Sequence, residues 1–386
     1  MINSILFFGD YPNEADPTLS VFFQTLIHAI ADKGIQCTVI SPVSMTKYRE
    51  KTFKIPYRTE EKTQEGKRIT VYHPKYFSFS SKVIGKIDTH TWTVKHLRRA
   101  AERTVKKEAL RFDATYGHFI NIGGISACRI GHRYHVPSFV ANGESDLNPS
   151  TYNYDSKYDL KPFINCSGVI SVSTKNKNEL IERKLIDPQR ITVIPNSIDE
   201  TIFKPLDQQE CRKRLGLPED KFIVGFVGGF SERKGYNRIL EAARDIPECH
   251  LAFCGKGATI PEADNIVFCD SLPHDQIPVF LNAIDVFVLP TLNEGCCNAV
   301  LEAMACGKAI VSSDREFNYD ILNKDEAMLV DPTDVNAIKE AIIEMKQNEE
   351  ERHQLGEAAL KKSQQFTIHE RARKIIEYME HVRQSR

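Results

Sequence analysis

Residues 286–311 read VFVLPTLNEGCCNAVLEAMACGKAIV, and this stretch decides the fold class. An apolar run of strand length ends at Pro290, and a polar loop then carries Glu294. Apolar residues at helical spacing follow from Asn298, and a second apolar run begins at Ala309. A strand, a helix and another strand in this order form the crossover unit of a parallel sheet.

The same alternation continues in both directions along the chain. After residue 221 it predicts strands at 222–226, 251–254, 266–268, 286–289 and 309–311, with helices at 236–243, 277–283 and 298–305. Before it, the pattern predicts strands at 4–8, 37–40, 114–116, 138–141, 169–172 and 191–194, with helices at 21–31, 92–111, 122–134 and 175–183. One further strand is predicted at 68–73, within a polar, basic and aromatic segment. Two such series indicate an α/β protein with two Rossmann-like, doubly wound domains whose strand ends line a central cleft.

The length of 386 residues supports two domains. We expect residues 1–200 to form the first domain and residues 201–366 the second, with 200–220 as a polar connector. Residues 367–386 are expected to form a C-terminal helix that packs towards the first domain. We interpret residues 47–81 as an inserted segment of loops and short strands rather than core.

The overall charge and hydropathy exclude several classes of protein. The formal net charge of -1 argues against a nucleic-acid-binding protein. No apolar run reaches the roughly 20 residues that a membrane span needs. The first 170 residues hold 23 Lys/Arg against 16 Asp/Glu, whereas the rest hold 28 against 36. This asymmetry indicates either an anionic partner of the first domain or solvated surface charge.

The loop that carries Glu294 is suited to a phosphorylated ligand. Unpaired backbone amides at the start of the following helix attract anions. Glu294 in the loop and Glu302 within the helix place two carboxylates along one long ligand. The alternative is a capped helix with a solvated glutamate.

A second stretch, residues 224–235, reads VGFVGGFSERKG. A strand here runs into a glycine-bearing loop that ends in Arg233 and Lys234. Glycines let the backbone approach phosphate oxygens closely, and the two cations supply the countercharge.

These two stretches resemble the retaining glycosyltransferases of family 4, which have the two-domain GT-B fold. Glu294 and Glu302, with seven residues between them, resemble the Glu-x7-Glu signature of that family. Residues 228–235 resemble its phosphate-clamp loop, and VIPNSID at 193–199 resembles its domain-junction motif. The segments FFGDYP at 7–12 and SVSTK at 171–175 also fit.

The resemblance implies a role for each matching residue. Glu294 contacts the donor sugar near the reacting carbon, and Glu302 holds the ribose hydroxyls. Arg233 and Lys234 neutralise the leaving diphosphate. His118 lies at the sugar as a further catalytic candidate, with an ordinary structural histidine as the alternative. The other implied donor-binding positions are Gly228, Gly229, Gly255, Lys256, Asp270, Leu272, Gly295, Asn298, Ala299 and Val300, and the implied acceptor or phosphate-side positions are Ser20 and Asn142.

The chain also departs from the family pattern. Gly229 stands where the family usually has arginine, so Arg233 is a candidate for replacing that charge. Ser20 stands near a position at which many members carry glycine. The chain contains no Asp-x-Asp, so we expect transfer to need neither a metal nor another cofactor. The resemblance implies that the anomeric configuration is retained through attack on the face from which the diphosphate leaves, with a phosphate oxygen as base.

The resemblance implies transfer of a hexose or N-acetylhexosamine from a nucleoside-diphosphate sugar, with uridine diphosphate (UDP) sugars favoured. The expected acceptor is a glycan or lipid-linked glycan of surface polysaccharide biosynthesis, and the expected location is cytoplasmic. The alternatives are a nucleotide-sugar epimerase, a glycan phosphorylase or a non-catalytic sugar-nucleotide-binding subunit of the same fold. The basic helix predicted at 92–111 favours peripheral attachment to the anionic inner face of the cell membrane. The alternative for that helix is ordinary solvated surface above an apolar side that packs on the first sheet.

Overall fold

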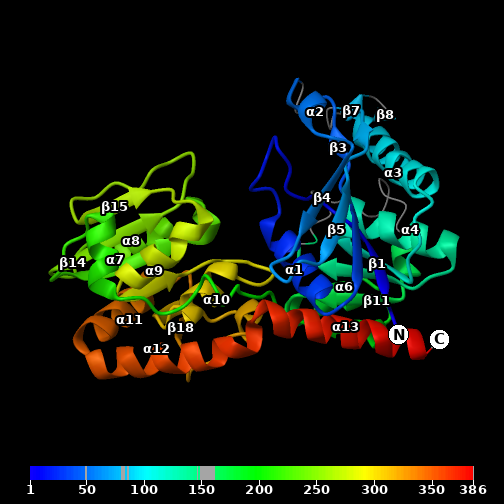
Figure 1. The fold of residues 1–386 in the computed structure, drawn as a ribbon. Coiled ribbons are helices and arrows are strands. Elements are labelled where there is room, and N and C mark those ends of the chain that lie inside the picture. Colours follow the sequence, from blue (N-terminus) through cyan, green and yellow to red (C-terminus); the bar gives the residue numbers. More distant parts are fainter. Residues whose placement is uncertain (48–49, 80–82, 85–86, 146, 148–160, 386) are drawn as a thin grey trace. The chain divides into compact units, whose positions relative to one another are not determined.

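The structure, a computed structural model, describes residues 1–47, 50–79, 83–84, 87–145, 147 and 161–385. The chain divides into two compact units. Unit 1 comprises Met1–Ile194 together with His369–Arg386, and unit 2 comprises Pro195–Ile368. Each unit has a central sheet with helices packed on it (Figure 1).

Unit 1 is built on an eight-stranded sheet in the order β12-β11-β10-β9-β1-β2-β5-β4. Neighbouring strands run parallel except for the antiparallel pair of β5 and β4 at one edge. The central strands are continuous buried runs, as parallel strands covered on both faces must be. The strands are β1 (Ser4–Phe8), β2 (Gln36–Ile40), β4 (Arg58–Lys62), β5 (Arg68–Tyr72), β9 (Ala114–His118), β10 (Ser138–Asn142), β11 (Gly168–Ser171) and β12 (Ile191–Val193).

The helices of unit 1 include the one formed by the C-terminal segment. They are α1 (Val21–Asp32), α2 (Glu50–Lys54), α3 (Thr89–Lys107), α4 (Ile125–Tyr134), α5 (Lys161–Ile164), α6 (Thr174–Glu182) and α13 (Ile368–Gln384), with a π-helical turn at Ile120–Gly124. The buried side chains of α13 include Ile375 and Met379, and its Tyr378 hydroxyl donates to the backbone oxygen of Arg190 over 2.6 Å. The last helix therefore packs on unit 1, as predicted.

The segment interpreted as an insertion is partly core, so that interpretation was wrong. β5 pairs with β2 inside the main sheet and buries Ile69 and Val71 completely or nearly so. Among the described strands of unit 1, the small pairs of β3 (Val43–Ser44) with β6 (Lys75–Tyr76), and of β7 (Val83–Ile84) with β8 (Ile87–Asp88), lie outside that sheet. Polar and apolar residues alternate over 68–72, because a strand near the edge of a sheet buries mainly one face. For this reason the sequence did not indicate that β5 belongs to the main sheet.

Unit 2 is built on a six-stranded, wholly parallel sheet in the order β15-β14-β13-β16-β17-β18. Its strands are β13 (Phe222–Val227), β14 (Cys249–Cys254), β15 (Ile266–Asp270), β16 (Val286–Leu289), β17 (Ala309–Ser313) and β18 (Met328–Val330). Its helices are α7 (Gln208–Leu215), α8 (Tyr236–Ala243), α9 (Ile277–Ala283), α10 (Asn298–Ala305), α11 (Val335–Gln347) and α12 (Glu349–Ser363). The prediction of two Rossmann-like parallel α/β sheets is confirmed. The polar segment at 200–220, expected as a connector, contains α7.

Both sheets have a point at which the strand order reverses. In unit 1 the chain builds outward from β1 through β2 and β5, and then returns to the other side of β1 with β9. In unit 2 it builds from β13 through β14 to β15, and then returns with β16. The carboxyl ends of the two strands at such a point diverge and leave a crevice, which is where doubly wound sheets bind their ligands. Among the described residues, no helix is long and apolar enough to cross a membrane.

Candidate active site

The reversal point of unit 2 holds a carboxylate between two cations. The loop after β13 supplies Arg233 and Lys234, and the loop after β16 supplies Glu294. Arg233 Nη1 lies 2.6 Å from Glu294 Oε1, and Lys234 Nζ lies 2.7 Å from the same oxygen. Glu294 is buried, with 9% of its surface exposed. Three residues that the sequence predicted to act on one ligand are thus in direct contact.

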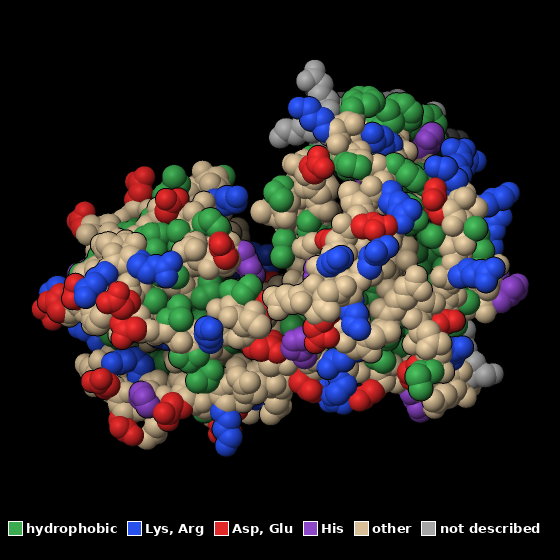
Figure 2. Space-filling view, in the orientation of Figure 1, with side chains coloured by type: hydrophobic (Ala, Val, Ile, Leu, Met, Phe, Trp, Pro, Cys, Tyr) green, Lys and Arg blue, Asp and Glu red, His purple; other side chains and the backbone are tan. Residues whose placement is uncertain are grey.

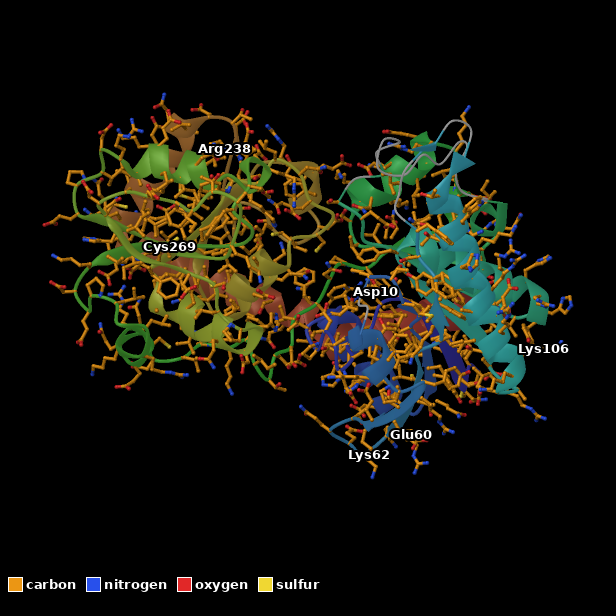
Figure 3. All side chains as sticks on the ribbon, turned by 90° about the horizontal axis from the view of Figure 1, so that it is seen from above. Asp10, Glu60, Lys62, Lys106, Arg238 and Cys269 are labelled. Atoms are coloured by element: carbon orange, nitrogen blue, oxygen red, sulfur yellow. The ribbon has the colours of Figure 1, made fainter. Side chains whose placement is uncertain are left out.

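Several backbone contacts fix the two loops against each other. The Leu292 amide donates to the backbone oxygen of Arg233 over 2.8 Å. Arg238, on α8 and labelled in Figure 3, donates to the backbone oxygens of Glu232 and Pro290. Gly235 has a φ of 82°, and a Cβ atom there would lie 2.5 Å from the Pro290 oxygen. Only glycine therefore allows the clamp loop to turn this close to the end of β16.

The charges of this cluster do not cancel. Burial alone lowers the pKa of Lys234, but Cys297 and Glu294 beside it outweigh this effect and raise it above its usual value. Burial raises the pKa of the Cys297 thiol to about 11, although Lys234 acts in the opposite direction. At neutral pH Cys297 is therefore a neutral thiol, and two cations face one carboxylate. The excess positive charge is suited to a phosphorylated ligand.

The glycine-bearing loops after β13 and β14 touch each other. A Cβ atom on Gly255 would lie 1.9 Å from the Gly228 oxygen, so the close approach of these loops requires glycine. The Gly255 amide donates to the backbone oxygen of Asp270 over 2.9 Å. Lys256 and Gly229 are exposed. Of the other predicted positions, Asp270 is exposed and Leu272 is half-buried, both at the end of β15.

The start of α10 joins the same edge of the sheet. Cys297 precedes the helix, and its side chain makes no capping hydrogen bond to the first turn of α10. Asn298 is exposed and accepts a hydrogen bond from Asn196 Nδ2 over 2.8 Å. Ala299 is half-buried, whereas Gly295 and Val300 are buried.

Glu302 has a partner that the sequence analysis missed. Its Oε1 lies 3.2 Å from Nε2 of His274, in the turn before α9. The hydrogen bond to Glu302 raises the pKa of His274, although partial burial opposes the shift. The ring of His274 also packs edge-on against Phe203 at 5.3 Å between centroids. No motif pointed to His274, because a polar loop histidine carries no spacing signal.

The reversal point of unit 1 has a different character. His118 ends β9 and is buried among the rings of Phe22, Phe23 and Phe119, with centroids 4.5 to 5.1 Å away. Burial lowers the pKa of His118 to about 3, and Arg371 on α13 adds to this effect. The imidazole is therefore neutral at physiological pH. Its Nδ1 is buried and makes no hydrogen bond to a described residue.

The two predicted acceptor-side residues lie in unlike surroundings. Ser20 precedes α1 with a φ of 52°, the left-handed conformation in which glycine is favoured, and its side chain does not cap the helix. This agrees with its place near a family glycine. Asn142 ends β10, is fully buried, and exchanges hydrogen bonds of 3.2 Å with Asn176. Its amide therefore serves the packing of β10 against α6.

Two residues after Asn142 lies a buried carboxyl group that sequence reasoning missed. Glu144 Oε1 accepts from the Ile120 amide over 2.7 Å, at the start of the π-helical turn. Burial raises the pKa of Glu144 to about 7, although backbone amides, Ile120 first among them, oppose the shift. Its Oε2 is buried without a hydrogen bond to any described residue. The sequence offered one signal for Glu144, namely an acidic residue two positions after the end of a buried strand.

Family comparisons match both units separately. The "Glycosyl transferases group 1" family matches residues 207–362. The "Glycosyltransferase Family 4" family matches residues 19–201. Together the two matches cover nearly all of the chain before α13.

A curated relative and two solved structures extend the comparison. The putative teichuronic acid biosynthesis glycosyltransferase TuaC of Bacillus subtilis is 29% identical over 344 residues, which is 86% of each chain. The structure of sucrose-phosphate synthase from Thermosynechococcus elongatus matches with a TM-score of 0.77 at 18% identity and covers 100% of both chains. HepE of Anabaena, solved in complex with UDP-glucose, matches with a TM-score of 0.69 at 17% identity, over 99% of this chain and 100% of HepE.

Proposed function

The chain belongs to glycosyltransferase family 4 and has the GT-B fold, and from this premise we propose that it is a retaining transferase that uses a UDP-sugar. Use of a nucleotide sugar as donor follows from the family. The UDP preference is supported by the fold of HepE, which binds UDP-glucose. The proposed product is a surface polysaccharide, a setting supported by the likeness to the TuaC protein.

The contact of Glu294 with Lys234 and Arg233 carries the proposal. A diphosphate that binds between the loops after β13 and β16 takes over the pairing with both cations. Glu294 is then released to accept hydrogen bonds from sugar hydroxyls next to the reacting carbon. One group thus changes partner from a cation to a sugar as the donor binds.

The departing UDP carries the negative charge that develops in the transition state. Lys234, Arg233 and the uncapped amides at the start of α10 oppose that charge without a metal ion. The proposed reaction retains configuration, with the acceptor hydroxyl attacking on the face from which UDP leaves and a phosphate oxygen taking its proton. Glu302 is assigned to the ribose hydroxyls and His118 to the sugar or acceptor.

A donor screen tests the proposal. UDP-, GDP- and ADP-sugars are compared by thermal shift, since a ligand that binds only the folded state raises its melting temperature. Release of UDP and transfer to a lipid-linked acceptor are then measured in excess EDTA. We expect stabilisation by UDP-sugars and transfer that persists in the chelator. Loss of transfer in EDTA that manganese restores contradicts the metal-free mechanism.

The same assay separates the rival activities. An epimerase converts the donor sugar without any acceptor, and a phosphorylase needs inorganic phosphate. A non-catalytic subunit is stabilised by the donor but releases no UDP. Any of these three outcomes overturns the proposed transferase.

A further inference from the structure

The helix α3 has one side committed to the core and another that no described element covers. Val94, Leu97, Ala101 and Val105 are each at most 5% exposed. The apolar side predicted for this helix therefore packs inside unit 1, and these side chains are not available to bind another partner. Any further role of α3 must depend on its outer side.

The outer side of α3 is basic and begins with an aromatic residue. Five of its exposed residues follow one another at intervals of three and four positions, so they share one face. They are Trp92, Lys95, Arg99, Arg103 and Lys106. No carboxylate among the described residues forms an ion pair with any of these four cations.

The neighbouring acids are already neutralised. Glu102 lies 3.5 Å from Arg129 and 3.6 Å from Arg133, both on α4. Glu108 lies 3.3 Å from Lys107 and accepts from the Tyr57 hydroxyl. The positive charge on the outer side of α3 is thus not balanced locally.

Exposed aromatic rings continue this face beyond the start of α3. Phe79 packs edge-on against Trp92 at 5.8 Å between centroids, and both are at least 39% exposed. Phe77, at 53%, follows β6, a strand in contact with α3. Phe53, at 67%, lies on α2 with the Lys75 ammonium 5.5 Å from its ring. Large apolar side chains exposed together mark an interaction surface.

We call these eight residues the basic–aromatic face: Phe53, Phe77, Phe79, Trp92, Lys95, Arg99, Arg103 and Lys106. Figure 2 shows hydrophobic side chains gathered at the end of unit 1 that carries α2, β7 and β8, with Lys and Arg side chains along the adjoining edge. Beside α3 lies a surface hollow of about 450 Å³, whose lining includes Arg99, Arg103 and Lys106 together with the ion pair of Glu102 and Arg133, and Ile130 and Tyr134 of α4.

We propose that the basic–aromatic face docks unit 1 on an anionic lipid bilayer. Cations at the headgroup level attract anionic lipids, and Trp and Phe side chains favour the boundary between headgroups and acyl chains. The hollow beside α3 brings Arg99, Arg103 and Lys106 together, and these cations would attract the phosphate of a lipid headgroup. The proposal does not depend on the chemistry of the donor site, because every residue of the face lies in unit 1.

The chain's single tryptophan makes the proposal directly testable. Trp92 emission is recorded while vesicles of phosphatidylcholine, with or without phosphatidylglycerol, are added to the whole protein. We expect a blue shift, and quenching by brominated lipid, with the anionic vesicles only. Raising the salt concentration should reverse both, since exposed charges are screened.

A matched pair of triple variants locates the binding surface. Arg99→Gln/Arg103→Gln/Lys106→Gln removes three cations of the face, and Lys62→Gln/Lys67→Gln/Arg68→Gln removes three exposed cations of the β4–β5 hairpin. Lys62 and Lys106 project from different parts of unit 1 (Figure 3). Each charge lost from the face should weaken co-sedimentation about fivefold, the equivalent of about 1 kcal/mol. The first variant should therefore lose about a hundredfold and the control far less.

Four outcomes overturn the proposal. The first is equal binding of the two triple variants to anionic vesicles, and the second is binding of the wild type to neutral vesicles as tight as to anionic ones. The third is unchanged Trp92 emission on vesicles that sediment the protein, because the lipid contact then lies elsewhere. The fourth is no binding of the protein to either kind of vesicle, which would favour an acidic protein as the partner of this face.

Discussion

In both units the candidate residues lie at the point where the strand order of the sheet reverses, but the chemistry of the side chains there is opposite. At the end of β13 and β16, unit 2 brings two cations onto one carboxylate within 2.7 Å. At the end of β9, unit 1 surrounds the neutral His118 with aromatic rings. The first arrangement suits a phosphorylated ligand, and the second suits an uncharged one.

The difference indicates that the reversal of strand order determines where a ligand can bind, whereas the residues of the loops determine which ligand binds there. In unit 2, Gly235 and Arg238 hold the cation-bearing loop against β16. In unit 1, Phe22 and Phe23 of α1 cover the corresponding space. This contrast is the reason why the proposed function assigns the donor diphosphate to unit 2 and gives His118 in unit 1 a role at the sugar or the acceptor.

The largest expected effect is that of Glu294. Glu294→Gln keeps the shape of the side chain but removes its charge, and we expect turnover to fall about a hundredfold or more, equivalent to about 2.7 kcal/mol. Glu294→Ala should also destabilise the fold by about 1–3 kcal/mol, because it leaves the largely buried Lys234 without its counter-ion. Steady-state kinetics and urea unfolding measure the two effects.

The matched control for Glu294 is Glu219→Gln. Glu219 is exposed and precedes β13, so it lies at the amino ends of the strands, whereas Glu294 lies at their carboxyl ends. Its replacement should leave turnover unchanged. Turnover of Glu294→Gln at the level of this control removes Glu294 from the reaction.

The central strands of both sheets were predictable because their burial produces continuous apolar runs. The edge strands β4 and β18 were not predicted, because β4 is polar along its length and β18 is a half-buried run of three residues. Helix α12 was missed because it has no apolar stripe: its buried residues are Leu355, Gly356, Ala359 and Ser363. Helix α7 was missed for the same reason, with Cys211 and Arg212 as its buried residues. Its ends were nevertheless marked, since Asp207 caps the first turn and Gly216 ends the helix in a left-handed conformation.

The site was predictable to the extent that each loop carried its own motif. Glu294 and Lys234 were each identified, but their ion pair joins residues sixty positions apart and leaves no trace in local spacing. The burial of Glu294 was likewise hidden, because its loop is polar in sequence. The partners His274 and Glu144 depend on tertiary packing that neither motif encodes.

The next largest effect concerns the two cations of unit 2. Lys234→Ala should weaken UDP binding by roughly ten- to a hundredfold, because a largely buried charge that pairs with phosphate is lost. Arg233→Ala should weaken it by roughly three- to tenfold, because its side chain is 43% exposed and screened by water. Calorimetric titration with UDP measures both, with Lys213→Ala as the exposed control. No effect of Arg233→Ala means that it does not replace the charge missing at Gly229.

A smaller effect distinguishes the carboxyl group of unit 1. The pKa of Glu144 is raised to about 7 from an ordinary value of 4.5, so the folded state favours the protonated form. Its stabilising contribution is complete below pH 4.5 and is lost as the pH rises towards 7. Glu144→Gln cannot ionise and should therefore gain stability relative to the wild type over that range, on the order of 2 kcal/mol. Urea unfolding at pH 5 and pH 8 measures the difference, and an equal gap at both values contradicts a buried, shifted carboxyl.

The smallest expected effect is a change in one histidine titration in unit 2. Because the hydrogen bond to Glu302 raises the pKa of His274, Glu302→Gln should lower it towards its ordinary value of 6.5. If Glu302 accepts from ribose hydroxyls, saturating uridine should compete for the same carboxylate and also lower that pKa. Uridine is chosen because the phosphates of UDP would themselves raise it. The titration is followed by NMR of the imidazole protons, with 2′,3′-dideoxyuridine as the matched ligand that lacks both hydroxyls. An equal shift with the two nucleosides means that the ribose hydroxyls do not reach Glu302, and the second carboxylate of the pair then has a structural role in holding the turn before α9.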